Sequence, residues 1–195
     1  MPKLLIVRHG QSEWNALGRW QGQADPPLTN LGESQARKAS QKLGLFDLIV
    51  SSPLQRAKNT ASIISELMGV GPVATEVGLM ERDAGPWQGL TRIEIENGWP
   101  GFLDSGNRPD GYESNPDLLL RVFKVLKKLS ESSEPSDSIL VISRAGIVHA
   151  LENLHDQPSI KVPNLGGRWV EFVDGELVMG KRISLVTEES MPDLL

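Results

Sequence analysis

The chain has 195 residues, of which 39% are hydrophobic, and its formal net charge is −5. This length is enough to bury one sizeable core, so we expect a single domain spanning residues 1–195. The negative charge argues against a broad nucleic-acid-binding surface, and the lack of cysteine excludes disulfides and thiolate metal ligands. No stretch resembles a signal peptide or a membrane span, which favours a soluble, cytoplasmic protein with no membrane partner.

Strand and helix signals alternate in the first part of the chain. Residues 3–7 form a short, branched apolar run that is typical of a strand buried in a parallel sheet. Small and apolar residues then recur at helical spacing and predict a helix that packs closely on a sheet. This stripe consists of Gly32, Ala36, Ala39 and Leu43. A second strand is expected over residues 47–50.

The next segment carries helix-start signals. Residues 52–55 read as a capping box with Pro53 at the first helical position, which predicts a helix that runs to about Met68. Residues 72–77 are expected to form a short strand. Thr91 and Glu94 form another capping box, which predicts a short helix before Gly98.

A long irregular excursion and a second strand-helix alternation complete the chain. Residues 98–116 are rich in Gly, Pro, Asp and Asn, which indicates a surface loop of the kind that lines a site or closes over it. Pro116 opens a helix with apolar residues on one face, and Ser-rich residues 130–138 end it. A strand over 139–142 and a helix from about Ala145 follow, and then a hairpin. The apolar helix face consists of Leu118, Val122, Val125 and Leu129, and the hairpin turn of Asp174 and Gly175.

This alternation predicts the fold class. We expect an α/β protein with three layers, in which a mostly parallel central sheet carries helices on both faces and ends in an antiparallel hairpin. Sites in such folds form at the carboxyl ends of the strands. The rule singles out three short segments, at residues 8–10, 51–56 and 143–144.

These segments contain the residue types that phosphate chemistry needs. A phosphate monoester is a dianion, and the guanidinium forks of Arg8, Arg56 and Arg144 suit its oxygens. A neutral imidazole can attack phosphorus and form a covalent intermediate, and His9 is the best-placed candidate. The leaving oxygen needs a proton, which Glu81 could donate from a loop. The sequence contains no metal-binding or nucleotide-cradling motif, so we expect no metal and no cofactor.

Three segments in order resemble the histidine phosphatase superfamily, which includes the cofactor-dependent phosphoglycerate mutases. They are LLIVRHGQSEWNALGRWQGQADPPLTNLG at residues 4–32, SSPLQRAKNTA at 51–61 and LMERDAGPWQGLT at 79–91. The resemblance implies a phosphoglycerate mutase-like fold.

The resemblance also implies a role for each matching residue. His9 becomes the phosphorylated nucleophile, Arg8 and Arg56 become phosphate ligands, and Glu81 becomes the proton donor, with Asp83 as a nearby rival. Asn15 is implied as a further phosphate ligand, and Gln21 and Gly22 as substrate contacts.

The fourth motif departs from the family pattern. The family carries a second histidine after the late strand, whereas ISRAGIVHAL at residues 142–151 has Arg144 there. His149 lies five positions further on, and helical geometry is expected to turn it away from Arg144. Guanidinium can hold phosphoryl oxygens but cannot release a proton. Arg144 therefore either binds phosphate, or turns to solvent or pairs with an acid. The tryptophans Trp14, Trp20, Trp87, Trp99 and Trp169 are expected to pack in the core or at its rim.

The leading hypothesis is a metal-independent phosphomonoesterase that works through a phosphohistidine at His9, with turnover modified by Arg144. Two alternatives stay open: a non-catalytic phosphate-binding protein and a phosphoglycerate mutase. The expected partner is a small phosphorylated substrate or phosphate. The resemblance also raises a homodimer as a candidate assembly.

Overall fold

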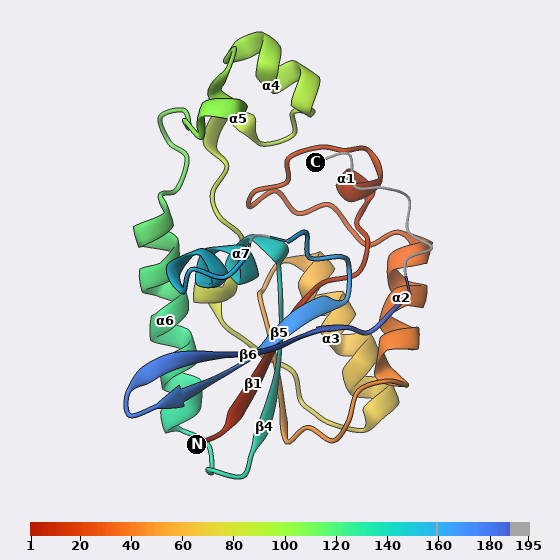
Figure 1. Ribbon diagram of the computed structural model, residues 1–195. Helices are drawn as coiled ribbons and strands as arrows, with labels where there is room; N and C mark the ends of the chain where they lie inside the picture. Colours follow the sequence, from red (N-terminus) through yellow and green to blue (C-terminus); the bar gives the residue numbers. More distant parts are fainter. Residues whose placement is uncertain (159, 188–195) are drawn as a thin grey trace.

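The computed structural model describes residues 1–158 and 160–187, which contain a six-stranded sheet with the order β3-β2-β4-β1-β5-β6 (Figure 1). Its strands are β1 (Lys3–Arg8), β2 (Leu48–Ser51), β3 (Ala74–Thr75), β4 (Ser138–Ser143), β5 (Gly166–Val173) and β6 (Glu176–Ser184). The first four pair in parallel, whereas β5 runs antiparallel to both β1 and β6. The expected parallel sheet with a C-terminal antiparallel hairpin is confirmed.

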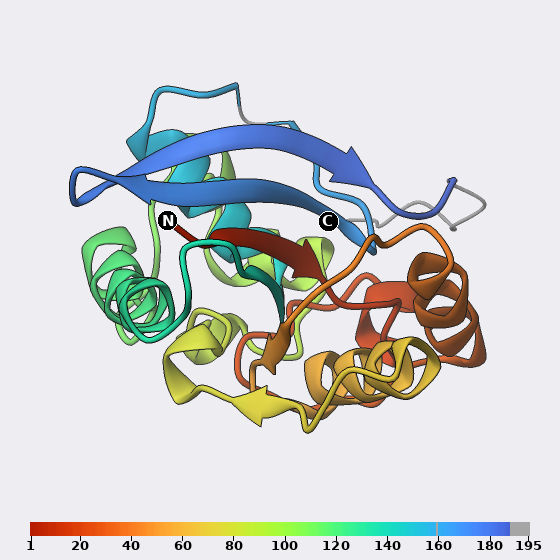
Figure 2. The same cartoon turned by 90° about the horizontal axis from the view of Figure 1, so that it is seen from below.

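Helices cover both faces of this sheet, which confirms the three layers (Figure 2). The helices are α1 (Glu13–Ala16), α2 (Asn30–Ser40), α3 (Gln55–Met68), α4 (Arg92–Gly98), α5 (Phe102–Ser105), α6 (Asn115–Glu131) and α7 (Ala145–Leu154), with 3-10 turns η1 (Val77–Leu79) and η2 (Gly85–Trp87). α2 and α3 pack on one face, and α6 and α7 on the other. None of the helices in the described ranges is long and apolar enough to cross a membrane.

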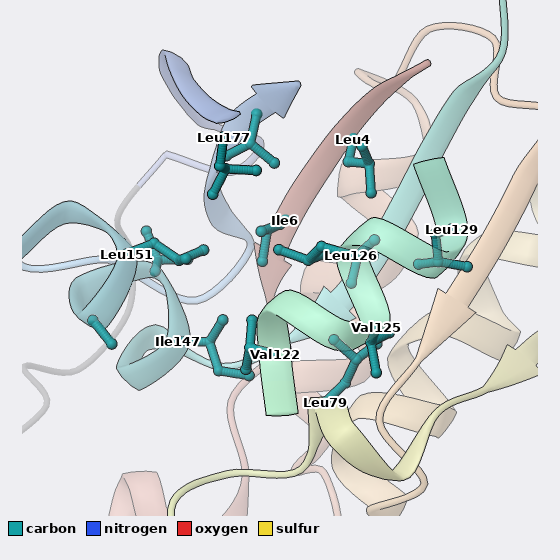
Figure 3. Packing of buried hydrophobic residues seen from close by; sticks show 14 of the residues in the cluster. Leu4, Ile6, Leu79, Val122, Val125, Leu126, Leu129, Ile147, Leu151 and Leu177 are labelled. Atoms are coloured by element: carbon teal, nitrogen blue, oxygen red, sulfur yellow. The ribbon is translucent and has the colours of Figure 1, made fainter. Parts of the chain in front are cut away.

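The two apolar cores follow from the alternation of side chains along β1. Leu4 and Ile6 point toward α6 and α7, while Leu5 and Val7 point toward α2 and α3. Figure 3 shows Ile6 beside Leu126 of α6 in the first core. Both faces of β1 are therefore buried, and its carboxyl end, where residue 9 follows, has a fixed position.

The capping box expected at residues 52–55 is wrong. α3 begins at Gln55, and no side chain of its own segment caps it. The carboxylate of Asp25 accepts the Gln55 N–H at 2.7 Å, so the cap comes from a distant segment, while the Ser52 hydroxyl accepts the Leu54 N–H at 3.3 Å. The second capping box, between Thr91 and Glu94, is confirmed at the start of α4.

The excursion over 98–116 is only partly irregular, because it contains α5. Figure 1 shows α4 and α5 beyond the carboxyl ends of β1 and β4. Buried Trp87 anchors this part, with edge-to-face contacts to the rings of Trp20, Trp99 and Tyr112. The cluster is separate from the two cores of the sheet, and it holds a wall above the strand ends.

Candidate active site

His9 follows β1 directly and is fully buried. Its backbone is fixed on two sides, because its N–H donates to the Ser143 carbonyl and its carbonyl accepts from the Asn164 side chain, both at 3.0 Å. The ring Nδ1 lies 2.5 Å from the Gly10 carbonyl oxygen, which can only accept, so Nδ1 carries the proton. The lone pair is then on Nε2, which has no hydrogen-bond partner within residues 1–158 and 160–187.

The surroundings of His9 keep the ring neutral. Burial, together with the charges of Arg144, Arg56 and Arg8, holds the pKa of His9 well below its usual range, and the Gly10 carbonyl opposes this only in part. The three arginines come from separate segments: Arg8 and Arg144 line one cavity, and Arg56 and Arg144 both approach the Gly22 carbonyl.

Arg56 lies in the first turn of α3 and is fully buried. Its Nη1 donates to the Ala24 carbonyl at 2.6 Å and its Nη2 to the Gly22 carbonyl at 2.9 Å, while the Asp25 carboxylate lies 3.7 Å away. Burial and the Arg144 charge lower the pKa of Arg56 to about 9, so the group still carries its charge at neutral pH.

Gly22 joins two of these arginines through one carbonyl. This oxygen accepts from Arg56 Nη2 and lies 3.5 Å from Arg144 Nη1. The φ angle of Gly22 is +52°, and a Cβ atom at this position would lie 2.8 Å from both Ala84 Cβ and Gln88 Oε1. Glycine is therefore required on grounds of backbone conformation and of space.

Arg144 and Glu81 form an ion pair. Arg144 Nε lies 2.7 Å from Glu81 Oε2, and each side chain is only 11% exposed. The other carboxylate oxygen of Glu81 accepts the Arg82 N–H at 2.7 Å. Arg144 thus points into the site and contacts the expected proton donor. Gly146 faces the same carboxylate, because a Cβ at this position would lie 2.6 Å from Glu81 Oε1.

A cavity of about 280 Å³ opens over this constellation. Six of the predicted site residues line it: Arg8, Asn15, Gln21, Gly22, Glu81 and Arg144. His9 and Arg56 are not in its wall, and both are fully buried. Asp83, the rival acid, is exposed, and its carboxylate accepts the Gly85 N–H instead of facing the cavity.

Hydrogen bonds hold the remaining predicted contacts in place. Arg8 donates to the Val162 carbonyl at 2.8 Å. The Asn15 side chain accepts from the Ser12 N–H at 3.2 Å, in a capping box at α1. The Ser12 hydroxyl in turn donates to Gln21 Oε1 at 2.8 Å.

The sequence did not indicate other residues of the cavity wall, namely Arg82, Tyr112, His149 and Lys161. His149 nevertheless lines the same cavity as Arg144, from a position five residues further along the chain. Arg144 is the N-cap of α7 with extended backbone (φ −138°, ψ 163°), so the helical period does not set its direction. Trp20 also contributes to the wall, although it packs on Trp87 as expected.

Within the described ranges, no three or more His, Cys, Asp or Glu side chains gather as a metal ion would need. The acidic and imidazole groups of the cavity instead contact arginine, backbone or one another.

The chain is similar to known proteins over most of its length. The family model of the histidine phosphatase superfamily (branch 1) matches residues 4–176. A glucosyl-3-phosphoglycerate phosphatase of Mycobacterium tuberculosis (strain CDC 1551 / Oshkosh) is 35% identical over 180 residues, which are 85% of this chain and 80% of that protein. A 2,3-bisphosphoglycerate-dependent phosphoglycerate mutase of Nitrobacter hamburgensis is 40% identical over 102 residues, 49% of each protein.

A solved structure shares the fold. The mycobacterial glucosyl-3-phosphoglycerate phosphatase in complex with VO3 superimposes with a TM-score of 0.83 at 30% identity, covering 92% of this chain and 97% of that chain. The expected fold class is confirmed, and these relatives are phosphatases and phosphoglycerate mutases.

Proposed function

The chain belongs to the histidine phosphatase superfamily, and on that premise we propose that it hydrolyses small phosphate monoesters through a phosphohistidine at His9. The observation that carries the proposal is the state of the His9 ring. It is buried and neutral, its Nδ1 is committed to the Gly10 carbonyl, and its Nε2 lone pair has no protein partner among the described residues. A neutral imidazole in this state is a nucleophile.

The reaction follows from the groups around that ring. His9 Nε2 attacks phosphorus, the bond from phosphorus to the ester oxygen breaks, and the departing oxygen takes a proton from Glu81. Water then attacks phosphorus and gives a proton back to Glu81. The bond from phosphorus to Nε2 breaks, phosphate is released and the lone pair returns to Nε2. Arg8 and Arg56 are the proposed ligands of the phosphoryl oxygens, whose charge they balance in the transition state. Asn15, Gln21 and Gly22 complete the proposed substrate contacts from the cavity wall.

Arg144 has two opposing effects in this scheme. Its charge favours neutral His9 and adds a donor for phosphoryl oxygens. Its Nε, however, contacts the Glu81 oxygen that would serve the leaving group. Arg144 therefore supports the nucleophile and competes with the leaving group for the acid.

The proposal is tested by measuring phosphate release from phenyl phosphate with wild type, with His9→Ala and with the matched control His155→Ala. We expect His9→Ala to fall to background and His155→Ala to retain activity, because His155 lies at the far end of α7. An acid-labile phosphoryl group on wild type during turnover would support the covalent step. Equal rates for wild type and His9→Ala would refute the hydrolase.

The Glu81–Arg144 ion pair favours one alternative, a protein that binds phosphate without turning it over. In that case wild type binds phosphate, and His9→Ala and wild type release phosphate at the same background rate. A mutase, which some relatives are by name, would instead return the phosphoryl group to a second phosphoglycerate molecule, and analysis of the products separates it from a hydrolase.

A further inference from the structure

The wall of the catalytic cavity contains an imidazole, that of His149, which the reaction described above does not use. His149 lies in α7 and lines the cavity together with Arg8, Glu81 and Arg144. Its side chain is 29% exposed, so most of the ring is enclosed by protein. Imidazole is the side chain that most readily gains or loses a proton near neutral pH. A group that can change its charge therefore borders the space in which the reacting phosphate binds.

The geometry of α7 places His149 close to the proposed acid. Gly146 and His149 are three positions apart in the helix, and residues at this spacing are neighbours on one helix face. A Cβ atom at Gly146 would lie 2.6 Å from Glu81 Oε1, so the Glu81 carboxylate lies against this turn of the helix. The His149 imidazole and the Glu81 carboxylate thus share one part of the cavity wall.

A buried carboxylate lies on the other side of the ring. Glu152 is fully buried, and its Oε2 lies 3.8 Å from His149 Nδ1. Nδ1 is enclosed and has no hydrogen-bond partner within residues 1–158 and 160–187. Because the two nitrogens lie on different sides of an imidazole ring, Nε2 is left for the cavity. His149 can therefore take a proton from the cavity while Glu152 stabilises the charge that results.

The protein environment favours the neutral form of His149. Burial lowers the pKa of His149, and the charges of Arg182 and Arg8 add to this effect, while Glu152 and Glu81 oppose it. The ring is therefore neutral at neutral pH, and it stays close to the point at which a further negative charge would protonate it.

Charged groups approach His149 from every element that packs near it, and most of them are cations. The catalytic cavity contributes Arg8, Arg82, Arg144, Lys161 and Glu81. An adjoining cavity, which His149 also lines, contributes Arg108 and Glu113, and behind the ring Glu152 pairs with Arg168 and Arg182. A phosphate dianion in the catalytic cavity would offset this excess of positive charge and favour the imidazolium form.

We propose that His149 takes up a proton when a phosphate dianion enters the catalytic cavity, and that it delivers this proton to Glu81. The proposal rests on the proposed function, because it supplies the proton that the leaving oxygen needs. Glu81 is paired with Arg144 as a carboxylate, and a carboxylate has no proton to donate. His149 is thus a proton relay that acts through Glu81.

The protons balance over one turnover. His149 gains a proton from solvent as the ester binds, and Nε2 passes it to a Glu81 oxygen, which returns the ring to its neutral form. Glu81 then protonates the leaving oxygen as the bond from phosphorus to that oxygen breaks. The water that attacks the phosphohistidine gives one proton to Glu81. This proton returns to His149 and to solvent when phosphate leaves, so one proton enters and one departs.

Proton uptake is measured with an anion that does not itself titrate. Tungstate is a tetrahedral dianion whose charge is constant near neutral pH, and its binding is followed by calorimetry in buffers that differ in ionisation enthalpy. Wild type is expected to take up about half a proton or more per bound tungstate. His149→Asn should lose this uptake. The matched control His155→Asn should keep it, because His155 lies at the C-terminal end of α7 and does not line the catalytic cavity.

Nuclear magnetic resonance identifies the ring that gains the proton. The chain contains three histidines, so their ring signals can be assigned with the single variants His9→Gln, His149→Asn and His155→Asn. Tungstate is expected to raise the proton affinity of His149 in wild type about tenfold. The signal of His149 can also be assigned by elimination from the other two variants, so the measurement stands even if His149→Asn does not fold. Thermal melting of each variant checks its folding.

Turnover tests the delivery of the proton to Glu81. Phenyl phosphate needs an acid for its leaving oxygen, whereas 4-nitrophenyl phosphate needs little help. We expect His149→Asn to reduce kcat for phenyl phosphate about tenfold, below the full contribution of an acid because solvent can still protonate Glu81 slowly. The kcat for 4-nitrophenyl phosphate and the KM of both esters should change little. In a Glu81→Gln background, His149→Asn should have no further effect.

The outcomes separate this proposal from the hydrolase. Uptake that survives His149→Asn in folded protein, or that disappears only in His9→Gln, overturns the relay. An equal loss of kcat for both esters in His149→Asn also overturns it. Uptake through His149 in a wild type that releases no phosphate supports His149 as the proton acceptor and refutes the hydrolase. Turnover without His149-dependent uptake does the reverse, and failure of tungstate to bind overturns both.

Discussion

Replacing Arg144 is expected to accelerate the hydrolysis of esters whose leaving group is a poor one. In wild type, Arg144 Nε lies 2.7 Å from Glu81 Oε2, and both side chains are largely shielded from water. The leaving oxygen must therefore take the place of a guanidinium before it can receive a proton from Glu81. Arg144→His and Arg144→Gln both remove this competitor, and only the first adds an imidazole.

The size of the effect follows from the strength of the contact. The contact is an ion pair by distance, although Arg144 Nε makes no hydrogen bond of good geometry with any described residue. A close charge pair that is shielded from water contributes about 1.5–3 kcal/mol, at the low end of measured couplings. Each 1.36 kcal/mol corresponds to a tenfold change in rate, so release of Glu81 can raise kcat by roughly ten- to a hundredfold. Loss of a donor to the phosphoryl oxygens works in the opposite direction, and this loss is the same for every ester.

Two substrates separate these contributions. 4-Nitrophenyl phosphate has a leaving group that departs with little help from an acid, whereas phenyl phosphate depends on protonation. We expect Arg144→Gln to raise the phenyl-to-nitrophenyl ratio of kcat by about tenfold. The single variant Glu81→Gln should have a lower ratio than wild type. In the double variant Glu81→Gln with Arg144→Gln, the tenfold rise caused by Arg144→Gln should vanish.

Competition between Arg144 and the leaving oxygen for Glu81 is ruled out if Arg144→Gln changes kcat by the same factor for both substrates, or if it slows phenyl phosphate more than 4-nitrophenyl phosphate. A gain in Arg144→His that is absent from Arg144→Gln would assign the benefit to the added imidazole. The same gain in both variants would assign it to the release of Glu81.

Three further perturbations have defined outcomes. Gly146→Ala should cut kcat by about a hundredfold without loss of stability in thermal melts, because the new methyl displaces Glu81 while alanine favours the helix. Glu152→Ala should destabilise the protein by about 3–5 kcal/mol in urea unfolding, because this buried carboxylate pairs with two arginines that would lose their partner. Burial also lowers the pKa of both His9 and His149, so the unfolded chain binds more protons than the native one below about pH 6.5. The free energy of unfolding should therefore fall as pH drops below that value, and a double variant with glutamine at both positions should lose this dependence.

Much of the fold could be predicted because its signals are local. The apolar runs of β1 and β4 and the turn at residues 174–175 depend on their own segments, and the structure confirms them. The predicted start of α3 was wrong because the signal that sets it is not local. Its cap is the carboxylate of Asp25, and no pattern within residues 52–55 could reveal a partner thirty positions away.

The site residues also differ in whether local patterns could reveal them. Strand ends and motifs indicated Arg8 and Arg144, which the structure brings to one cavity. His149 was missed because its place depends on how α7 meets the neighbouring wall, which is a property of packing. Lys161 was missed because it follows no motif, and the nearby Arg8–Val162 contact that ties its segment to β1 spans 154 positions.

The separation between the aromatic cluster around Trp87 and the two cores of the sheet has an evolutionary consequence. Substitutions in the cluster reshape the entrance to the cavity while the strands that fix His9 keep their own packing. Descendants of one ancestral enzyme can thus diverge in the esters they accept and inherit the same phosphoryl chemistry. Diversity among related proteins should accordingly concentrate between residues 92 and 112, beyond the family motif at residues 79–91.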